Sequence, residues 1–282
     1  MRFTTSRPLM LFRHVARLIG TDGLRGAIAH AAGRVTGSMR NYGIGGTLSR
    51  TVRQQPDAAV TTISGEPTLP QTHPFDLQHG TDTSGCLPGA VLAPTSLSAL
   101  YITGYIGIGP SALAQAIAAL PIQHQDFSFV DLGCGKGRAL LVASKFPFRH
   151  LLGVELAPEL CRTAQANIVT RPEWAARISV LQHDAATVRL PDGPLVIFMF
   201  HPFFARILRR VLANLERQLH QAPRETWLLY ADNPRFPGVM ERFPFLREIS
   251  ETHYPLSPED AAANDFQLSY ERFTLYRAVF DR

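Results

Sequence analysis

The stretch Val130-Asp-Leu-Gly-Cys-Gly-Lys-Gly-Arg138 follows an apolar run typical of a buried strand and precedes a helical pattern. Its glycines, Gly133, Gly135 and Gly137, alternate with other residues, so that the backbone can turn tightly and approach a ligand closely. Amide groups at the start of the following helix would face that ligand. The stretch therefore predicts a strand, a ligand-binding loop and a helix in direct succession.

Strand and helix patterns alternate around this loop. Short apolar runs rich in branched residues are typical of strands buried in a parallel sheet, and segments of helical period separate them. The predicted strands cover residues 127–132, 150–155, 178–183, 195–200 and 226–231, and the predicted helices cover 111–120, 137–146, 158–167 and 205–219. This order is that of a doubly wound α/β sheet, a Rossmann-like fold.

The end of the chain has a different pattern. Residues 246–253 and 266–280 alternate apolar with other residues, and the second segment contains the bulky Tyr270, Phe273 and Tyr276. Such alternation is typical of antiparallel strands. We therefore expect a mostly parallel sheet that ends in a C-terminal antiparallel hairpin.

The first part of the chain is basic. Residues 1–70 contain nine arginines, no lysine and three acids, whereas the remainder is close to neutral. Residues 8–19 have the period of a short amphipathic helix, and a Gly-, Ser- and Pro-rich linker follows. We divide the chain into an N-terminal helical and irregular arm, 1–74, and a compact domain, 75–282. The pattern favours docking of the helix on its own domain. The alternatives are weak contact with an anionic membrane surface and an organelle-targeting segment.

Composition argues against several classes of protein. A neutral compact region lacks the broad basic surface of a nucleic-acid-binding protein. The cysteines, Cys86, Cys134 and Cys161, show no Cys-x-x-Cys spacing, so we expect neither a disulfide framework nor a metal site. No apolar run reaches the roughly 18 residues of a membrane span. We expect a soluble, cytoplasmic protein.

Two acids mark the ends of later strands. Glu155 closes the strand at 150–155, and Asp184 follows the strand at 178–183. Since the carboxyl ends of parallel strands meet at one edge of a sheet, both acids are expected near the glycine loop. A dinucleotide fingerprint requires glycine at the sixth position from Gly133, where Arg138 stands, which argues against a nicotinamide dinucleotide. A tight turn without any ligand is the other alternative.

The apolar strand, Asp131 and the Gly-x-Gly-x-Gly loop together resemble the first motif of the class I S-adenosylmethionine-dependent methyltransferases. The similarity extends over about residues 94–280. The wording "FVDLGCGKGRALLVAS", "GVELAPEL" and "AQAN" looks like a poorly characterised bacterial group of these enzymes, and more distantly like protein-lysine methyltransferases. Residues 75–85, "FDLQHGTDTSG", also look like a leader of that group.

The resemblance implies S-adenosylmethionine as the cofactor. Glu155 would accept both ribose hydroxyls, and Asp184 with the Ala185 amide would meet the adenine. Asp131 and the Gly133 carbonyl would face the methionine ammonium, with Tyr105 leaning over that end. The cofactor residues that the resemblance implies are Tyr105, Asp131, Gly133, Cys134, Gly135, Gly137, Glu155, Asp184 and Ala185.

The acceptor side begins where the strand at 195–200 runs into His201-Pro-Phe-Phe204. In many class I enzymes that methylate nitrogen, this strand ends in Asn or Asp, Pro and an aromatic residue. Pro202 and Phe203 match that pattern, whereas His201 departs from it and leaves the acceptor atom open. The three are the candidate catalytic residues. The alternatives are a strand-end histidine bonded to a carbonyl and ordinary core packing.

Three polar features have ordinary explanations beside functional ones. Residues 81–84, together with His73 and His79, form either a lid over the pocket or a solvated loop. Lys136 is expected at a solvated edge of the glycine loop. Asp-Asn-Pro at 232–234 favours a turn.

The expected function is methyl transfer from S-adenosylmethionine to a nitrogen or oxygen acceptor on a protein side chain or a small molecule. The alternatives are a module that binds the cofactor without turnover, and an NAD-binding oxidoreductase.

Overall fold

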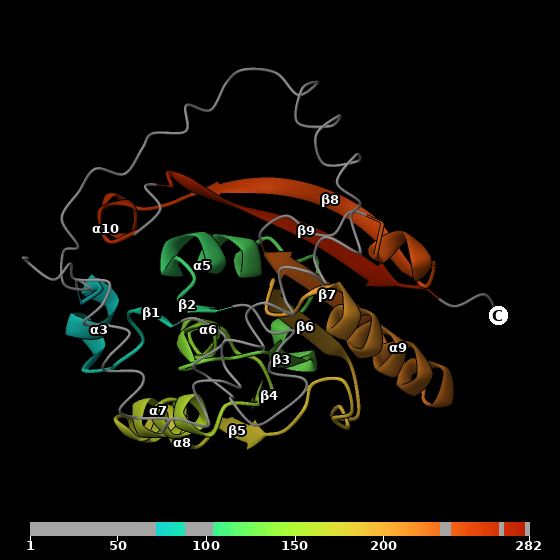
Figure 1. Cartoon of the computed structure of the whole chain (residues 1–282), viewed down its shortest axis with the longest axis horizontal. Helices are drawn as coiled ribbons and strands as arrows, with labels where there is room; N and C mark the ends of the chain where they lie inside the picture. The colour runs from blue at the N-terminus through green and yellow to red at the C-terminus, as the bar shows by residue number, and fades with distance from the viewer. Residues whose placement is uncertain (1–71, 88–103, 232–237, 265–267, 280–282) are drawn as a thin grey trace, which may run out of the picture. The chain divides into compact units, whose positions relative to one another are not determined.

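The computed structural model describes residues 72–87, 104–231, 238–264 and 268–279 (Figure 1). The amphipathic helix expected at 8–19, most of the linker and the turn at 232–234 lie outside these residues. The boundary between residues 74 and 75 stays a prediction, although His73 is already buried.

A seven-stranded sheet has the order β5-β4-β3-β6-β7-β9-β8. Its strands are β3 (Ser128–Leu132), β4 (His150–Glu155), β5 (Ile178–Gln182), β6 (Leu195–Phe200), β7 (Thr226–Ala231), β8 (Leu246–Pro255) and β9 (Tyr270–Ala278). The first five in the chain pair in parallel, which confirms the predicted sheet. β4, β6 and β7 begin and end at the predicted residues.

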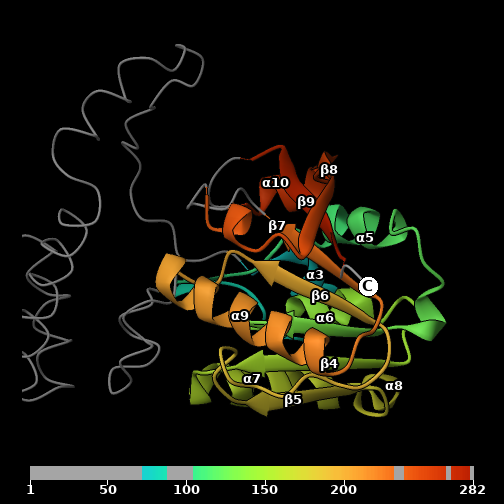
Figure 2. The same ribbon diagram turned by 90° about the vertical axis from the view of Figure 1, so that its right-hand side faces the viewer.

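The C-terminal hairpin is confirmed. β9 pairs antiparallel with both β7 and β8, so β8 forms one edge of the sheet and β5 the other (Figure 2). The register shifts between Glu248 and Ser250, where β8 has an irregularity. Within its described part, β9 is shorter than the predicted strand at 266–280.

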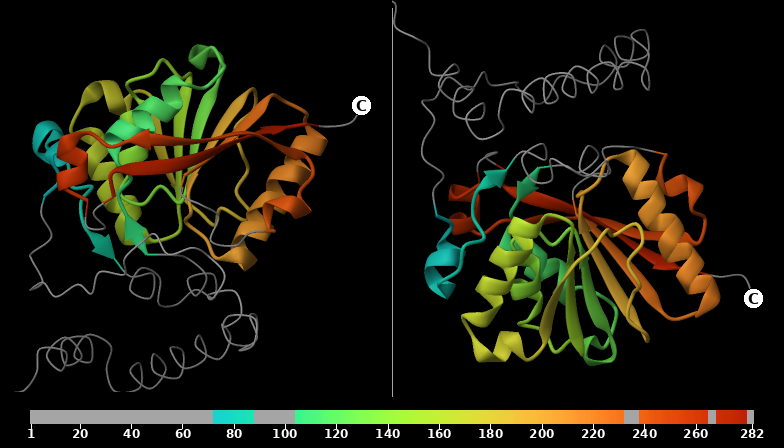
Figure 3. Two further views of the ribbon diagram at one scale, coloured as in Figure 1. Left: turned by 90° about the horizontal axis from the view of Figure 1, so that it is seen from above. Right: turned by 60° about the horizontal axis from the view of Figure 1, so that its bottom comes forward.

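Helices cover both faces of the sheet (Figure 3). The helices are α3 (Pro74–His79), α5 (Pro110–Ala118), α6 (Arg138–Ala143), α7 (Pro158–Val169), α8 (Pro172–Ala175), α9 (Ala205–Gln221) and α10 (Pro258–Ala262), with short 3-10 turns at His124–Asp126 and Met240–Arg242. Apolar residues of α5 and α6 pack on one face, and those of α9 pack on the other. The centre of the sheet is therefore buried on both sides, as its apolar strands require.

Several short elements do not follow from the sequence pattern. α8 and α10 each form about one turn that begins at a proline, a residue that suits the first helical position. The strands β1 (Cys86–Leu87) and β2 (Tyr105–Ile106) pair antiparallel as a separate two-stranded sheet. β2 comes directly before the loop to α5, and this placement brings Tyr105 to the glycine loop.

Candidate active site

The glycine loop between β3 and α6 has a backbone that few other residues can adopt. Gly133 has a φ of 89° and Gly135 a φ of 54°, both in the left-handed region. A Cβ at Gly135 would lie 2.3 Å from the Tyr105 ring, and a Cβ at Gly133 would lie 2.5 Å from Cβ of Pro202. Glycine is therefore required here by conformation and by space, as the sequence predicted.

A cleft of about 850 Å³, open to solvent, lies where β3, β4, β5 and β6 end. This edge of a doubly wound sheet is where ligands bind. The cleft brings together most of the predicted site residues, namely Tyr105, Asp131, Gly133, Cys134, Gly135, Glu155, Asp184, Ala185, Pro202 and Phe203. Gly137 and His201 are not among its lining residues.

Glu155 connects the end of β4 to the glycine loop. Its Oε2 accepts a hydrogen bond from the Gly135 amide at 2.9 Å, and its Oε1 accepts one from the Ala157 amide at 2.8 Å. The residue is only 8% exposed, and burial raises its pKa although the backbone amides oppose this. The carboxylate is thus held in one orientation at the cleft.

Asp131 is the second buried acid of the cleft and lies within β3. Burial, and then the charge of Glu155, raise the pKa of Asp131 well above its ordinary value. Two carboxyl groups so close together and so well buried favour a ligand that carries positive charge.

Asp184 starts the turn after β5. Its Oδ1 accepts a hydrogen bond from the Ala186 amide at 2.9 Å, and its Oδ2 lies 3.9 Å from Nη2 of Arg210 on α9. Ala185 is buried beside it. The third predicted acid therefore reaches the same cleft from the neighbouring strand.

Tyr105 covers the glycine loop from the side of β2. Its ring lies against Gly135, and its hydroxyl donates a hydrogen bond to the Thr83 carbonyl at 2.6 Å. Burial raises the pKa of this phenol, so it stays protonated as a donor. Of the predicted residues, Tyr105 is the one that comes from upstream of the loop.

The acceptor side of the cleft is formed by the segment after β6. Pro202 and Phe203 line the cleft, and Pro202 contacts Gly133. His201 is buried with a φ of 29°, the one positive φ outside glycine among the described residues. Its ring packs edge-on against Phe200 at a centroid distance of 4.9 Å. This strained backbone turns the chain from β6 toward α9.

The structure adds residues that the sequence did not single out for the site. Arg138 lines the cleft although it is only 5% exposed, and Thr83 and Asn167 are buried beside the loop. The expected solvated position of Lys136 is wrong. Its Nζ donates to Asp82 Oδ1 at 2.6 Å and to the Ser84 carbonyl at 2.7 Å. For Arg138, the one signal in the sequence was that a basic residue stands at the position where a dinucleotide fingerprint has glycine.

Residues 129–222 match the family of the methyltransferase domain. The match covers the glycine loop, the acid that ends β4 and the strand order up to α9. This part of the chain is therefore similar to a methyltransferase domain. The seven-stranded sheet, in which the antiparallel β9 lies between β7 and β8, agrees with the Rossmann-like fold that the sequence predicted.

Solved structures of methyltransferases are similar to this chain at low identity. They include the glycopeptide N-methyltransferase MtfA complexed with (S)-adenosyl-L-methionine, 14% identical with a TM-score of 0.45 over 63% of this chain and 89% of that one. A SAM-dependent methyltransferase from Aquifex aeolicus is 13% identical, with a TM-score of 0.42 over 60% and 92%. A TehB-like SAM-dependent methyltransferase from Corynebacterium glutamicum is 19% identical, with a TM-score of 0.40 over 62% and 90%. No curated protein matches the sequence.

The cofactor of the methyltransferase is S-adenosylmethionine, and the cleft fits it. Because Gly135 and Gly133 carry no Cβ, Tyr105 and Pro202 can lie directly against the loop and form walls of the cleft. The two buried acids suit a ligand with a sulfonium and an ammonium group. Within the described ranges, no group of three potential metal ligands is present. None of the helices in those ranges has the length and apolar character needed to cross a membrane.

Proposed function

We propose that the enzyme transfers a methyl group from S-adenosylmethionine to a nitrogen or oxygen atom of its acceptor. The observation that carries the proposal is the single cleft in which the acids of β3 and β4 meet Pro202 and Phe203 of the acceptor side. S-adenosylmethionine supplies an electrophilic methyl group on its sulfonium. Placement of two reactants in line accounts for most of the acceleration of such a displacement.

The residues of the chain would divide this task by position. Glu155, fixed by two backbone amides, would hold the ribose hydroxyls, and Asp131 would offset the positive charge of the methionine end. Asp184 and Ala185 would bind the adenine from the turn after β5. Pro202 and Phe203 would exclude water on the acceptor side.

The acceptor is proposed to be a protein side chain or a small molecule. His201 stays a candidate catalytic residue, since a neutral imidazole can accept a proton, although its ring is not among the groups that line the cleft. A cytoplasmic location also stays a proposal, supported by the free thiols of Cys134 and Cys161. So does weak membrane contact of the N-terminal arm.

A labelled-methyl assay with cell extract tests the proposal. We expect the wild-type enzyme to incorporate label. Incorporation by Glu155→Ala should be at least about tenfold lower, because hydrogen bonds to a charged group are strong. Glu159→Ala is the matched control, because this glutamate is exposed on α7 and four residues away. Separation of labelled macromolecules from labelled small molecules identifies the acceptor class.

Tight binding of S-adenosylhomocysteine without incorporation into any fraction would instead favour a module that binds the cofactor without turnover. A thermal-shift measurement separates the remaining alternative, because an oxidoreductase would be stabilised by a nicotinamide dinucleotide. We expect stabilisation by S-adenosylhomocysteine and none by NAD.

A further inference from the structure

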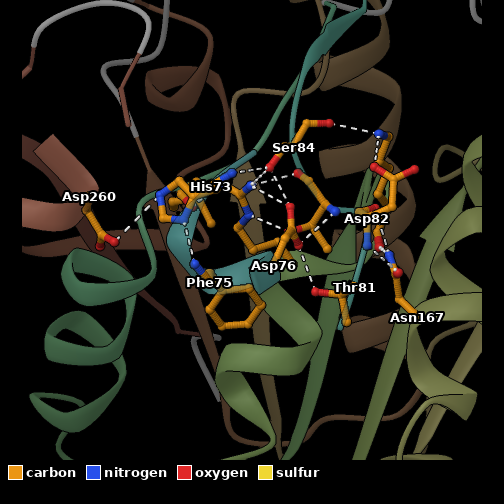
Figure 4. Close-up of polar contacts among 12 residues, drawn as sticks. His73, Phe75, Asp76, Thr81, Asp82, Ser84, Asn167 and Asp260 are labelled. Atoms are coloured by element: carbon orange, nitrogen blue, oxygen red, sulfur yellow. Dashed lines mark hydrogen bonds and ion pairs between the residues drawn. The ribbon is translucent and has the colours of Figure 1, made fainter. Parts of the chain in front are cut away.

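Residues 73–84, here called the leader segment, pack beside the glycine loop in a dense polar network (Figure 4). The Asp76 carboxylate is its centre. It accepts hydrogen bonds from the Thr81 hydroxyl at 2.7 Å, from the Thr83 amide at 2.9 Å and from the Ser84 hydroxyl. The predicted solvated loop at 81–84 is thus wrong for Thr83, which is fully buried.

Thr83 connects three elements through two of its atoms. Its hydroxyl donates to Asp76 Oδ1 at 2.6 Å and accepts from Nε of Arg138 at 2.8 Å. Its carbonyl accepts from Nη2 of Arg138 at 2.8 Å and from the Tyr105 hydroxyl at 2.6 Å. Each of these bonds leads either to the leader segment or to a residue of the cofactor cleft.

Both cleft residues held by Thr83 act directly on the shape of the site. Tyr105 covers Gly135, and Arg138 is the first residue of α6 and lines the cleft. The guanidinium also fills the space beside Gly107, where a Cβ would lie 2.4 Å from Nη1. Thr83 itself does not line the cleft, so that any effect on the cofactor must pass through its partners.

A second set of hydrogen bonds, made by Asn167, holds the same part of the leader segment. Asn167 on α7 accepts from the Asp82 amide at 2.8 Å, and donates to the carbonyls of Asp82 and Lys136, both at 2.9 Å. Lys136 lies within the glycine loop and returns a bond to Asp82. The residue before Thr83 is thereby fixed to the loop, which keeps Thr83 in register with Arg138.

We propose that Thr83 is a positioning residue for the cofactor. Through Tyr105 and Arg138 it keeps the glycine loop in the shape that binds S-adenosylmethionine, and it makes the leader segment a part of the site. This inference rests on the proposed cofactor site, because it assigns Thr83 to the reaction by way of that site.

The matched pair Thr83→Val and Thr83→Ser tests the proposal in the full-length enzyme. Valine has nearly the same shape but no hydroxyl, whereas serine keeps it. Calorimetry with S-adenosylhomocysteine, well below the melting temperature, should show about tenfold weaker binding for Thr83→Val and a change within about twofold for Thr83→Ser. In the methyl-transfer assay, the KM for S-adenosylmethionine of Thr83→Val should rise more than kcat falls.

Leu219→Ala controls for general loss of stability. Leu219 is fully buried in α9 on the other face of the sheet, so its removal lowers the melting temperature without touching the loop. We expect normal affinity in this variant. Equal affinities of Thr83→Val, Thr83→Ser and wild type would overturn the proposal, whereas a wild-type enzyme that does not bind S-adenosylhomocysteine would contradict the cofactor site itself.

Tyr105→Phe keeps the test decisive should Thr83→Val not fold. It removes one hydrogen bond to the Thr83 carbonyl and keeps the ring on Gly135. About three- to fivefold weaker binding of S-adenosylhomocysteine supports the positioning role. Wild-type affinity in a folded Tyr105→Phe would overturn it.

Discussion

Asp131 and Glu155 are buried carboxyl groups on neighbouring strands, and their protonation affects what the cleft binds. The pKa of both lies above the ordinary carboxyl range because of burial, and for Asp131 also because of Glu155. Burial thus disfavours the charged forms of both groups in the free enzyme, whereas a cationic ligand favours them. Cofactor affinity should rise with pH through the raised pKa of Asp131, with release of protons on binding.

Calorimetry of S-adenosylmethionine binding tests this expectation. Starting above the ordinary carboxyl pKa of about 4, affinity should increase with pH in wild type, and the binding heat should depend on the buffer's heat of ionisation. Asp131→Asn should bind at least about tenfold more weakly at neutral pH, and its pH dependence should be flatter. The same pH profile in both proteins would show that Asp131 does not titrate on binding.

Gly135 and Gly80 form a natural pair for a second prediction. Both have a positive φ, but a Cβ at Gly135 would meet the Tyr105 ring, and a Cβ at Gly80 would meet nothing within 4 Å. Each alanine variant should lose about 1–2 kcal/mol of stability from backbone strain. Gly135→Ala should in addition weaken S-adenosylhomocysteine binding at least about tenfold, whereas Gly80→Ala should bind normally. Chemical denaturation and calorimetry separate the two effects, and equal affinities would contradict the steric argument.

The residues of the cleft were largely predictable from the sequence, because spacing along strands decides which side chains reach the sheet edge. Asp131, Glu155 and Asp184 each follow from the end of a strand. Thr83 was not predictable in its role, since its partner Arg138 lies 55 positions away. Contacts over such distances depend on how the leader segment packs, and no local period indicates that.

At the scale of elements, the central strands β3, β6 and β7 were predictable because they are apolar on both faces, and the C-terminal strands were predictable because apolar residues alternate with others. α10 was missed because a single turn leaves too short a pattern, yet it anchors other elements. Asp260 on α10 accepts a hydrogen bond from the Ser111 amide in the first turn of α5 at 2.7 Å, and lies 3.6 Å from Nε2 of His73. Nδ1 of the same histidine accepts from the Phe75 amide and so caps α3.

His73 gives stability a dependence on pH. Burial, and then the charge of Arg138, lower the pKa of this histidine below its ordinary 6.5. Below about pH 6.5, His73 binds a proton in the unfolded chain but remains neutral in the folded chain until a lower pH is reached. Stability therefore falls as the pH falls. His73→Asn, which still caps a helix, should remove up to about 1.4 kcal/mol per pH unit from this slope. Urea unfolding from pH 8 to pH 5 measures it, and an unchanged slope would assign the effect to other groups.

At the scale of the whole molecule, the chain divides into residues 1–66 and 67–282. The described core and the cleft use residues from His73 onward. The amphipathic pattern at 8–19 favours docking of the arm on its own domain, so a chain that begins at Pro67 should melt about 2–4 °C below the full chain, which corresponds to about 1 kcal/mol. Its affinity for S-adenosylhomocysteine should be unchanged. An unchanged melting temperature would contradict docking of the arm.

The sheet order has a practical consequence for recombinant production. A gene fragment cut at residue 222, where the family match ends, would lack the strand that pairs with β6 and the two that follow it. The apolar β6 would then be an exposed edge strand, which favours aggregation with other chains. Expression vectors for this enzyme should therefore encode a chain that begins before His73 and includes Ala278.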